Sequence, residues 1–365
     1  MRALVLMMFT ALFVLAVGEP PRARAGGSAS SIAGGCQRFA APWGSDRSGR
    51  GTFRRPFKSV RRLDRALAPG QTGCLMPGRY GSIRTWHLLA ADGRPAARIT
   101  IRSYPGATAT IVGYVDIESS YTTLSYLNID GSNVFYNQAH PGTDCPRPVS
   151  QSLVIAGRND ILEHDNYYQS VARLRSNGIG IGFWGDADNT IIRYDKIHDV
   201  GQCQAYDQLI YVSHGNNVQI YDNWLWNDPH GRGVQLYPAP TNARVYNNVI
   251  FRAGEGFGVG NEAGDTVSGN HIYDNIVSHA TGLRWEDIPG MCINDSYGGT
   301  PGTGNVFDHN DCYRDPGGIA RVSAIRMYDN TTADPDFVNP ARHDYALLPS
   351  SSLVEHDLWA ALSAP

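Results

Sequence analysis

The chain has 365 residues, of which 18% are charged, and its formal net charge is −3 at pH 7. Its 40 glycines and 19 tyrosines favour a protein of many turns and strands over a helical protein. We find no run of lysines and arginines of the kind that binds nucleic acid, so we expect no nucleic-acid partner.

The N-terminus has the order of features of a secretory signal. Arg2 precedes the apolar run "ALVLMMFTALFVLAV", and the small-residue stretch "ARA" lies at residues 23–25. This order predicts cleavage after Ala25 and a secreted, extracellular protein, which we expect to be a monomer free of the membrane. The alternative is an uncleaved anchor, but the apolar run is shorter than the roughly 20 residues that span a bilayer.

The next segment predicts a short amphipathic helix. In "RPFKSVRRLDRALAPGQTGCLMPGRY", Val60, Leu63 and Leu67 recur at helical spacing, and Pro69-Gly70 ends the pattern.

Six later stretches align with one another, each with a short apolar strand, a polar bend and a second apolar strand. They are "ILEHDNYY" from residue 161, "IIRYDKIH" from 191, "VQIYDNWLW" from 218, "ARVYNNVIF" from 243, "NHIYDNIVS" from 270 and "NVFDHNDCY" from 305. Their aligned bend residues, 25 to 35 positions apart, are Asn166, Lys196, Asn223, Asn248, Asn275 and Asn310. A period in this range predicts a solenoid, whose open apolar end the helix would cap.

The pattern within each unit selects the type of solenoid. Alternation with period 2, rich in Val, Ile and Tyr, excludes helical repeats, and a propeller blade needs about 40 residues or more. A parallel coil with three short strands per turn remains. Asparagines stacked at one bend would satisfy polar groups of the next turn, and we expect Lys196 to interrupt this ladder once.

Six cysteines make an even number in a chain expected to be exported, where disulfides persist. Fifteen pairings are possible. Because neighbours close the shorter loops, the preferred pairs are Cys36–Cys74, Cys145–Cys203 and Cys292–Cys312. No cysteine lies in a CxxC motif, so a zinc or redox site is the weaker interpretation.

Several segments carry a resemblance to a known family. The stretches "PWGSDRSGRGTFRRPFKSV" and "LAPGQTGCLMPGRYG", the coils and the tail "DPDFVNPARHDYALLPSSSLV" resemble the right-handed parallel β-helix proteins of the pectate-lyase-like superfamily. The resemblance implies an all-β fold and a polysaccharide partner. The superfamily includes polysaccharide lyases, uronate epimerases, glycoside hydrolases and proteins of no known activity, so function must be argued from the site.

With this fold, the chain divides into four parts. We expect a signal peptide at 1–25, an N-terminal cap with the first coils at 26–110, further β-helix coils at 111–330, and a C-terminal cap or tail at 331–365.

Four strands, at 178–184, 209–215, 233–239 and 256–262, predict one face of the coil. If the inward residues are Ile181, Phe183, Ile210, Val212, Val234, Leu236, Phe257 and Val259, the residues between them point outward. Those are Gly182, Tyr211, Gln235 and Gly258, which would form a shallow trough suited to a sugar chain. Alternatively, the glycines mark bends or close stacking of coils.

Loops at both ends of these strands concentrate reactive side chains. We expect substrate binding by Arg173, Arg175, Trp184, Tyr206, Asp207, His214, Gln235, Tyr237 and Glu255. The alternative for each loop residue is a solvated turn, because loops are polar in every protein.

The stretch "NDPHGRG" suits proton abstraction beside a uronate carboxylate. Arg232 would neutralise that carboxylate, His230 would be the base, Tyr211 would be the acid and Asp228 would orient His230. Strict alternation back from Val234 would point Arg232 inward, so the scheme requires a turn at Gly231 or Gly233.

Three other functions compete with this lyase. Asp228-Pro229-His230 resembles the "DPH" motif of alginate epimerases, which share the first proton abstraction. Paired carboxylates on the same groove would make a glycoside hydrolase. A carbohydrate-binding or surface protein without catalysis would use the same exposed aromatics.

No cofactor follows directly from the sequence. The carboxylates of Asp186 and Asp188 in "GDADN" are candidate ligands for Ca²⁺. The alternative is an ordinary turn, because Asp, Asn and Gly are the common turn residues.

Overall fold

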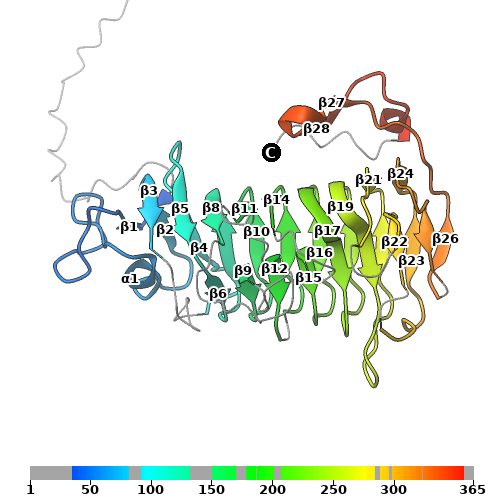
Figure 1. Ribbon diagram of the computed structural model, residues 1–365. Coiled ribbons are helices and arrows are strands. Elements are labelled where there is room, and N and C mark those ends of the chain that lie inside the picture. Colours follow the sequence, from blue (N-terminus) through cyan, green and yellow to red (C-terminus); the bar gives the residue numbers. More distant parts are fainter. Residues whose placement is uncertain are drawn as a thin grey trace, which may run out of the picture. The chain divides into compact units, whose positions relative to one another are not determined.

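The described part of the protein is a coil of parallel strands. The computed structural model describes residues 35–81, 92–131, 150–169, 178–185, 187–200, 207–283, 288–295, 298–322 and 324–356. The chain separates into two units, Met1–Ile32 and Ala33–Pro365, and every described residue belongs to the second. Within this unit, strands of successive coils lie side by side in parallel (Figure 1).

The strands form three faces. The first face contains β1 (Arg38–Ala40), β2 (Thr72–Leu75), β4 (Ile99–Ser103), β7 (Thr122–Ser125), β10 (Ile161–Glu163), β13 (Ile191–Arg193), β16 (Gln219–Tyr221), β18 (Arg244–Tyr246), β20 (His271–Tyr273), β23 (Val306–Asp308) and β26 (Arg326–Tyr328). The second face contains β3 (Gly78–Tyr80), β5 (Ala109–Val112), β8 (Leu127–Asp130), β11 (Asn166–Tyr168), β14 (Lys196–His198), β21 (Ile276–Ser278) and β24 (Asp311–Tyr313). The third face contains β6 (Val115–Ile117), β9 (Ser150–Ile155), β12 (Gly178–Phe183), β15 (Gln208–Val212), β22 (Ile293–Asn294) and β25 (Ala320–Arg321).

Two long strands, β17 (Trp224–Leu236) and β19 (Val249–Val259), run through both the second and the third face. The first part of β17 pairs with β14, and its last part pairs with β15. The predicted parallel coil with three strands per turn is therefore confirmed.

The core is built from rows of inward side chains, one from each coil. On the first face one such row, paired in register and buried throughout, consists of Leu124, Leu162, Ile192, Ile220, Val245, Ile272 and Phe307. Because each strand alternates its side chains, equal register between coils repeats the same inward position. Each coil therefore buries its apolar surface against its two neighbours.

The bend between the first and second faces is a turn of two residues. Its first residue has a positive φ in successive coils, as at Asp222 (φ 57°) and Asn247 (φ 57°). The second residue belongs to a column of buried or nearly buried side chains, the ladder: Asp165, Asp195, Asn223, Asn248, Asn275, Asn310 and Asn330. In each step the backbone N–H of one member donates to the side-chain oxygen of the next, at 2.7–3.1 Å.

In two coils the residue predicted to stand at the bend lies one position beyond the ladder. The register pairs Lys196 with Asn166 and with Trp224, so Asn166 and Lys196 lie one position beyond the ladder. Asp165 and Asp195 occupy the ladder positions instead, and the column continues past Lys196 without a break. The step requires only an oxygen acceptor for a backbone N–H, and a carboxyl supplies one as well as an amide does.

Asp195 satisfies only part of its hydrogen-bonding capacity. Its Oδ1 accepts from the N–H of Asp165, whereas Oδ2 has no hydrogen-bond partner among the described residues. In the next coil, Nδ2 of Asn223 donates to the carbonyl oxygen of Ile192 at 3.0 Å. Burial, with the neighbouring charge of Asp165, raises the pKa of Asp195 well above its usual range, and burial raises the pKa of Asp165 to about 8.

Asp195→Asn is expected to raise the melting temperature at pH 8 more than at pH 5. A carboxyl whose folded-state pKa is raised contributes stability that is complete below about pH 4, its unfolded value, and is lost as the pH rises through the folded value. The amide of the Asp195→Asn variant cannot ionise, so this loss of stability does not occur, and its N–H₂ group adds a hydrogen-bond donor. The free energy of unfolding at pH 8 should rise by about 1–2 kcal/mol. Thermal unfolding at both pH values measures it, with the exposed Asp329→Asn as the control. An equal change at the two pH values would contradict the assignment.

The N-terminal end of the coil is covered by the predicted helix. Helix α1 (Val60–Asp64) begins after Ser59, whose Oγ accepts from the N–H of Arg62 at 3.1 Å. Helix α1 lies beside β1 and β2 (Figure 1). Val60 and Leu63 are buried in it, and Leu67 is buried just beyond the helix end. The capping helix is therefore confirmed, although it is shorter than the spacing of its apolar residues suggested.

The C-terminal segment packs on the outside of the second face. Strands β27 (Phe337–Asn339) and β28 (Asp344–Leu347) form an antiparallel hairpin, joined by the 3-10 helix η4 (Pro340–Arg342) and followed by η5 (Ser352–His356). Tyr345 and Leu353 join Trp224, Val249 and Ile276 in an apolar cluster separate from the core. Among the described residues, no helix is long and apolar enough to cross a membrane.

Candidate functional site

The third face presents the predicted row of outward residues. Gly182, Tyr211, Gln235 and Gly258 pair in register across β12, β15, β17 and β19. The eight residues predicted to point inward on these strands are at most 1% exposed and lie in the core. The inward and outward positions on these strands are thus as the alternation predicts.

Arg232 also faces outward, through an irregularity that the strand alternation did not predict. A Cβ at Gly233 would lie 2.7 Å from Cγ2 of the core residue Ile250, so Gly233 faces the interior. The adjacent Val234 is in the core as well. Two successive inward positions return Arg232 to the outer side, and the pairing of β17 with β19 is irregular just before it. Of the two glycines at which the scheme required a turn, Gly233 provides it, because its missing side chain leaves room for the core.

Arg232 is the centre of a buried polar network. Its Nε donates to Oε2 of Glu255 at 3.1 Å, and Nδ2 of Asn294 donates to Oε1 of Glu255 at 2.7 Å. Beside this pair, Nε2 of Gln208 donates to Oε1 of Gln235 at 2.8 Å. Both side chains of the ion pair are 0% exposed. Arg232 therefore has no exposed surface with which to grip a substrate carboxylate.

The side chain of Arg232 occupies the space that Gly258 leaves open. A Cβ at Gly258 would lie 2.5 Å from Cδ and 2.7 Å from Nε of Arg232. This glycine is required for the close approach of a side chain. The trough predicted from two glycines is thus filled at one of them.

Asp228 lies at a buried corner of the coil rather than beside His230. It pairs with the core residue Ala253, and neither of its carboxyl oxygens has a hydrogen-bond partner among the described residues. Burial, followed by the charge of Asp207, raises the pKa of Asp228 well above its usual range, whereas the charge of Arg232 lowers it. Asp228 therefore does not orient His230 by a hydrogen bond.

Asp207 is likewise part of the structure beneath the face. Its Oδ1 accepts from the N–H of Gly178 at 2.6 Å, and its carbonyl oxygen accepts from the N–H of Arg232 at 2.9 Å. Its side chain is 0% exposed. Asp207 was predicted to bind substrate, but its carboxylate is buried and binds the backbone of a neighbouring coil.

The accessible side chains of this face are mainly aromatic. Trp184 is 49% exposed, and its ring lies 6.1 Å from that of Tyr211, at 60°. Tyr211, His230 and Tyr237 are partly exposed, and His214 is exposed, with Nδ1 3.1 Å from Oγ of Ser213. An exposed aromatic pair beside ionisable groups is a common arrangement in binding sites for small polar ligands.

Some of the residues expected at the site lie outside the described residues. These are Arg173, Arg175, Tyr206 and Asp186, together with the cysteine pair Cys145–Cys203. Asp188 is described: it accepts from the N–H of Asn216 at 2.8 Å and lies 3.8 Å from Nε of Arg158. Its carboxylate joins the turns of neighbouring coils, and calcium binding at Asp186 and Asp188 stays a prediction.

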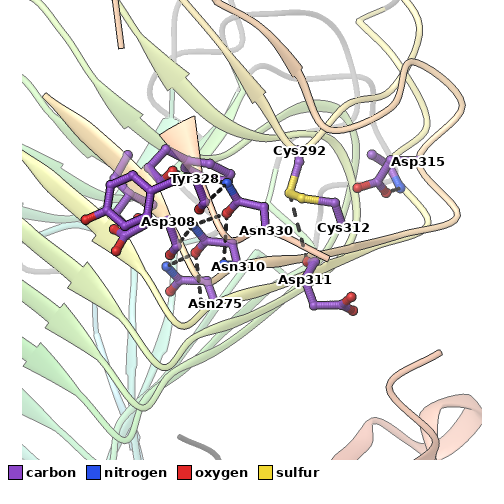
Figure 2. The surroundings of a disulfide bond; sticks show 12 residues. Asn275, Cys292, Asp308, Asn310, Asp311, Cys312, Asp315, Tyr328 and Asn330 are labelled. Atoms are coloured by element: carbon purple, nitrogen blue, oxygen red, sulfur yellow. Dashed lines mark hydrogen bonds between the residues drawn. A yellow bond between two sulfur atoms is a disulfide. The ribbon is translucent and has the colours of Figure 1, made fainter. Parts of the chain in front are cut away.

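The other two predicted disulfides, Cys36–Cys74 and Cys292–Cys312, are present. Figure 2 shows Cys292–Cys312 beside the end of the ladder. Asp315 lies within 4.8 Å of both sulfur atoms, but these are bonded to each other and are not free to bind a metal.

Three buried polar residues of this face were not predicted to belong to it. Gln208 precedes the stretch read as the strand, and Asn294 follows Ile293 in "CIND". Asp116, in β6, belongs to the same outward row through Val154. Burial, with the charge of Glu118, raises the pKa of Asp116 to about 7. Only the register between strands distant in sequence places Asp116 here.

Comparison with known proteins supports the fold. No protein-family model matches the chain, and no curated protein matches its sequence. A solved pectate lyase, Pel9A, is 12% identical, with a TM-score of 0.58 over 87% of this chain and 90% of that chain. An alginate lyase from Paenibacillus sp. str. FPU-7 is 14% identical, with a TM-score of 0.46 over 75% and 96% of the two chains. At identities this low, structural similarity is evidence of the fold alone. Of these two structures, only the pectate lyase has a TM-score high enough to support that conclusion. The chain is a right-handed parallel β-helix, similar in fold to this pectate lyase.

Proposed function

We propose that this protein acts on a uronic-acid-containing polysaccharide and cleaves it by β-elimination on the outer side of the third face. The observation that carries the proposal is the exposed Trp184 beside the partly exposed Tyr211 of the outward row. The exposed indole of Trp184 can stack against a sugar ring next to the hydroxyl of Tyr211, which can serve as an acid.

In the proposed reaction, His230 removes the proton from the carbon beside the uronate carboxylate. The electron pair forms a carbon–carbon double bond, the bond to the glycosidic oxygen breaks, and the hydroxyl of Tyr211 gives that oxygen its proton. Because Arg232 is buried, we assign neutralisation of the carboxylate to Arg173 or Arg175, which the sequence suggests as substrate-binding residues. Arg232, Glu255 and Asn294 act as positioning residues under the face.

The proposal is tested by incubating the protein with polygalacturonate, alginate and a neutral glucan. A lyase produces ultraviolet absorbance from unsaturated ends with the uronate polymers only. His230→Ala and Tyr211→Phe are each expected to lower this rate by about 10²-fold or more. Tyr246→Phe, on the first face, is the matched control and should retain full activity. A fully active His230→Ala protein would remove the proposed base.

A glycoside hydrolase is the second candidate, favoured by Asp116. A carboxyl on the same outward row with a pKa of about 7 could donate a proton near neutral pH. This function predicts reducing ends without ultraviolet absorbance, and their loss in Asp116→Asn. Binding without either product, lost in Trp184→Ala, would indicate a carbohydrate-binding protein.

A further inference from the structure

A separate cavity lies on the second face, where the C-terminal segment crosses the coil. Its volume is about 430 Å³, within the range of small-molecule sites. Asn166, Lys196, His198 and Trp226 line it from the coil, and Arg342 and His343 line it from the C-terminal segment. The proposed polysaccharide site uses none of these residues.

Stacked rings form one wall of the cavity. Trp226 lies between the imidazoles of His198, 4.2 Å away at 4°, and His343, 4.9 Å away at 20°. Tyr168 stacks on the other side of His198. Trp226 is 5% exposed, and its indole N–H has no hydrogen-bond partner among the described residues. The wall therefore contains a buried indole donor that has no acceptor among the described residues, and its accessible surface is provided by the stacked rings.

Positive charge predominates around the cavity. Lys196 and Arg342 are cationic, whereas the near carboxylate, Asp199, is engaged by Nδ1 of His198 at 2.6 Å and by Asn227. The buried Asp165 also lines the cavity, but its oxygens accept from the N–H of Leu127 and the hydroxyl of Tyr167.

Donors outnumber acceptors in this cavity, and its volume exceeds that of a simple ion. The amide of Asn166, whose Oδ1 lies 2.9 Å from Nε2 of His198, and that of Asn128 add groups that bind hydroxyls. An anionic group that also carries hydroxyls fits this combination better than a neutral sugar or an inorganic anion does.

We propose that this cavity is a binding site for a sugar acid, with the carboxylate held by Lys196 and Arg342 and the hydroxyls held by the amides. Since the coil and the C-terminal segment each supply one cation, the bound ligand joins the segment to the coil. The site is independent of the proposed catalytic function.

Calorimetric titration with galacturonate, a monosaccharide that contains no bond for a lyase to cleave, tests the proposal in the intact protein. One site per chain is expected, with a dissociation constant at least tenfold weaker in Lys196→Gln and in Arg342→Gln. Arg244→Gln, an exposed residue of the first face, is the control and should bind as the unaltered protein does. The titration is repeated in Tyr211→Phe, where unchanged binding separates this site from the polysaccharide face.

Galactose and inorganic phosphate distinguish the ligand class. Galactose should not bind detectably, and phosphate should bind at least tenfold more weakly than galacturonate. Equal binding of galactose, equal or tighter binding of phosphate, or unchanged galacturonate binding in both charge variants would each overturn the proposal. Arg342 is exposed, so its replacement tests the site without disturbing the core.

Discussion

Glu255→Ala is expected to lower the free energy of unfolding by about 3–5 kcal/mol, because it leaves the charge of Arg232 buried and without its counter-charge. Both side chains of this pair are 0% exposed, and Nε of Arg232 lies 3.1 Å from Oε2 of Glu255. The loss of Glu255 also removes the acceptor of Asn294. Chemical denaturation followed by circular dichroism measures the effect, with comparison of midpoints, because a solenoid need not unfold in a single step.

Two further variants make this prediction specific to a buried pair. Glu163→Ala removes the partner of Arg193 at 2.6 Å on the first face, where both side chains are partly exposed, and should cost less than about 1 kcal/mol. The double variant Arg232→Met/Glu255→Leu should recover most of the loss, because an apolar pair has no charge to desolvate. A loss as small as that of Glu163→Ala would mean that water reaches Arg232.

Asn248→Ala is expected to be the second most costly change, at about 3 kcal/mol or more. The Oδ1 of Asn248 accepts from the backbone N–H and from Nδ2 of Asn223, and its Nδ2 donates to the carbonyl oxygens of Ile220 and Tyr246 and to Oδ1 of Asn275. Each buried group left without a partner costs about 1–3 kcal/mol. The midpoint of chemical denaturation measures the loss.

A matched asparagine lies at the edge of the same coil region. Asn216 is exposed, and its Oδ1 accepts from Oγ1 of Thr241 and Nδ2 of Asn242. Asn216→Ala should therefore change the free energy of unfolding by less than about 1 kcal/mol, since water replaces the lost bonds. Equal losses at Asn216 and Asn248 would show that burial of the ladder does not matter.

The site could be predicted only where inward and outward side chains alternate strictly along a strand. Val234 and Leu236 are inside, and Gln235 is outside, as period 2 requires. The rule failed at Arg232, because successive inward positions at Gly233 and Val234 depend on the space above Ile250. That space is set by the packing of a neighbouring coil, which no local pattern records.

The repeat, the inward rows, the capping helix and the cysteine pairs Cys36–Cys74 and Cys292–Cys312 could all be predicted from the sequence. These follow from periodicity and from short separations along the chain. The tertiary structure alone decided that Asp195 continues the ladder, that Arg232 is buried, and that Lys196 and Arg342 line one cavity. Each of these depends on the register between coils or on where the C-terminal segment packs, and such contacts join residues far apart in sequence whose local patterns are compatible with several arrangements.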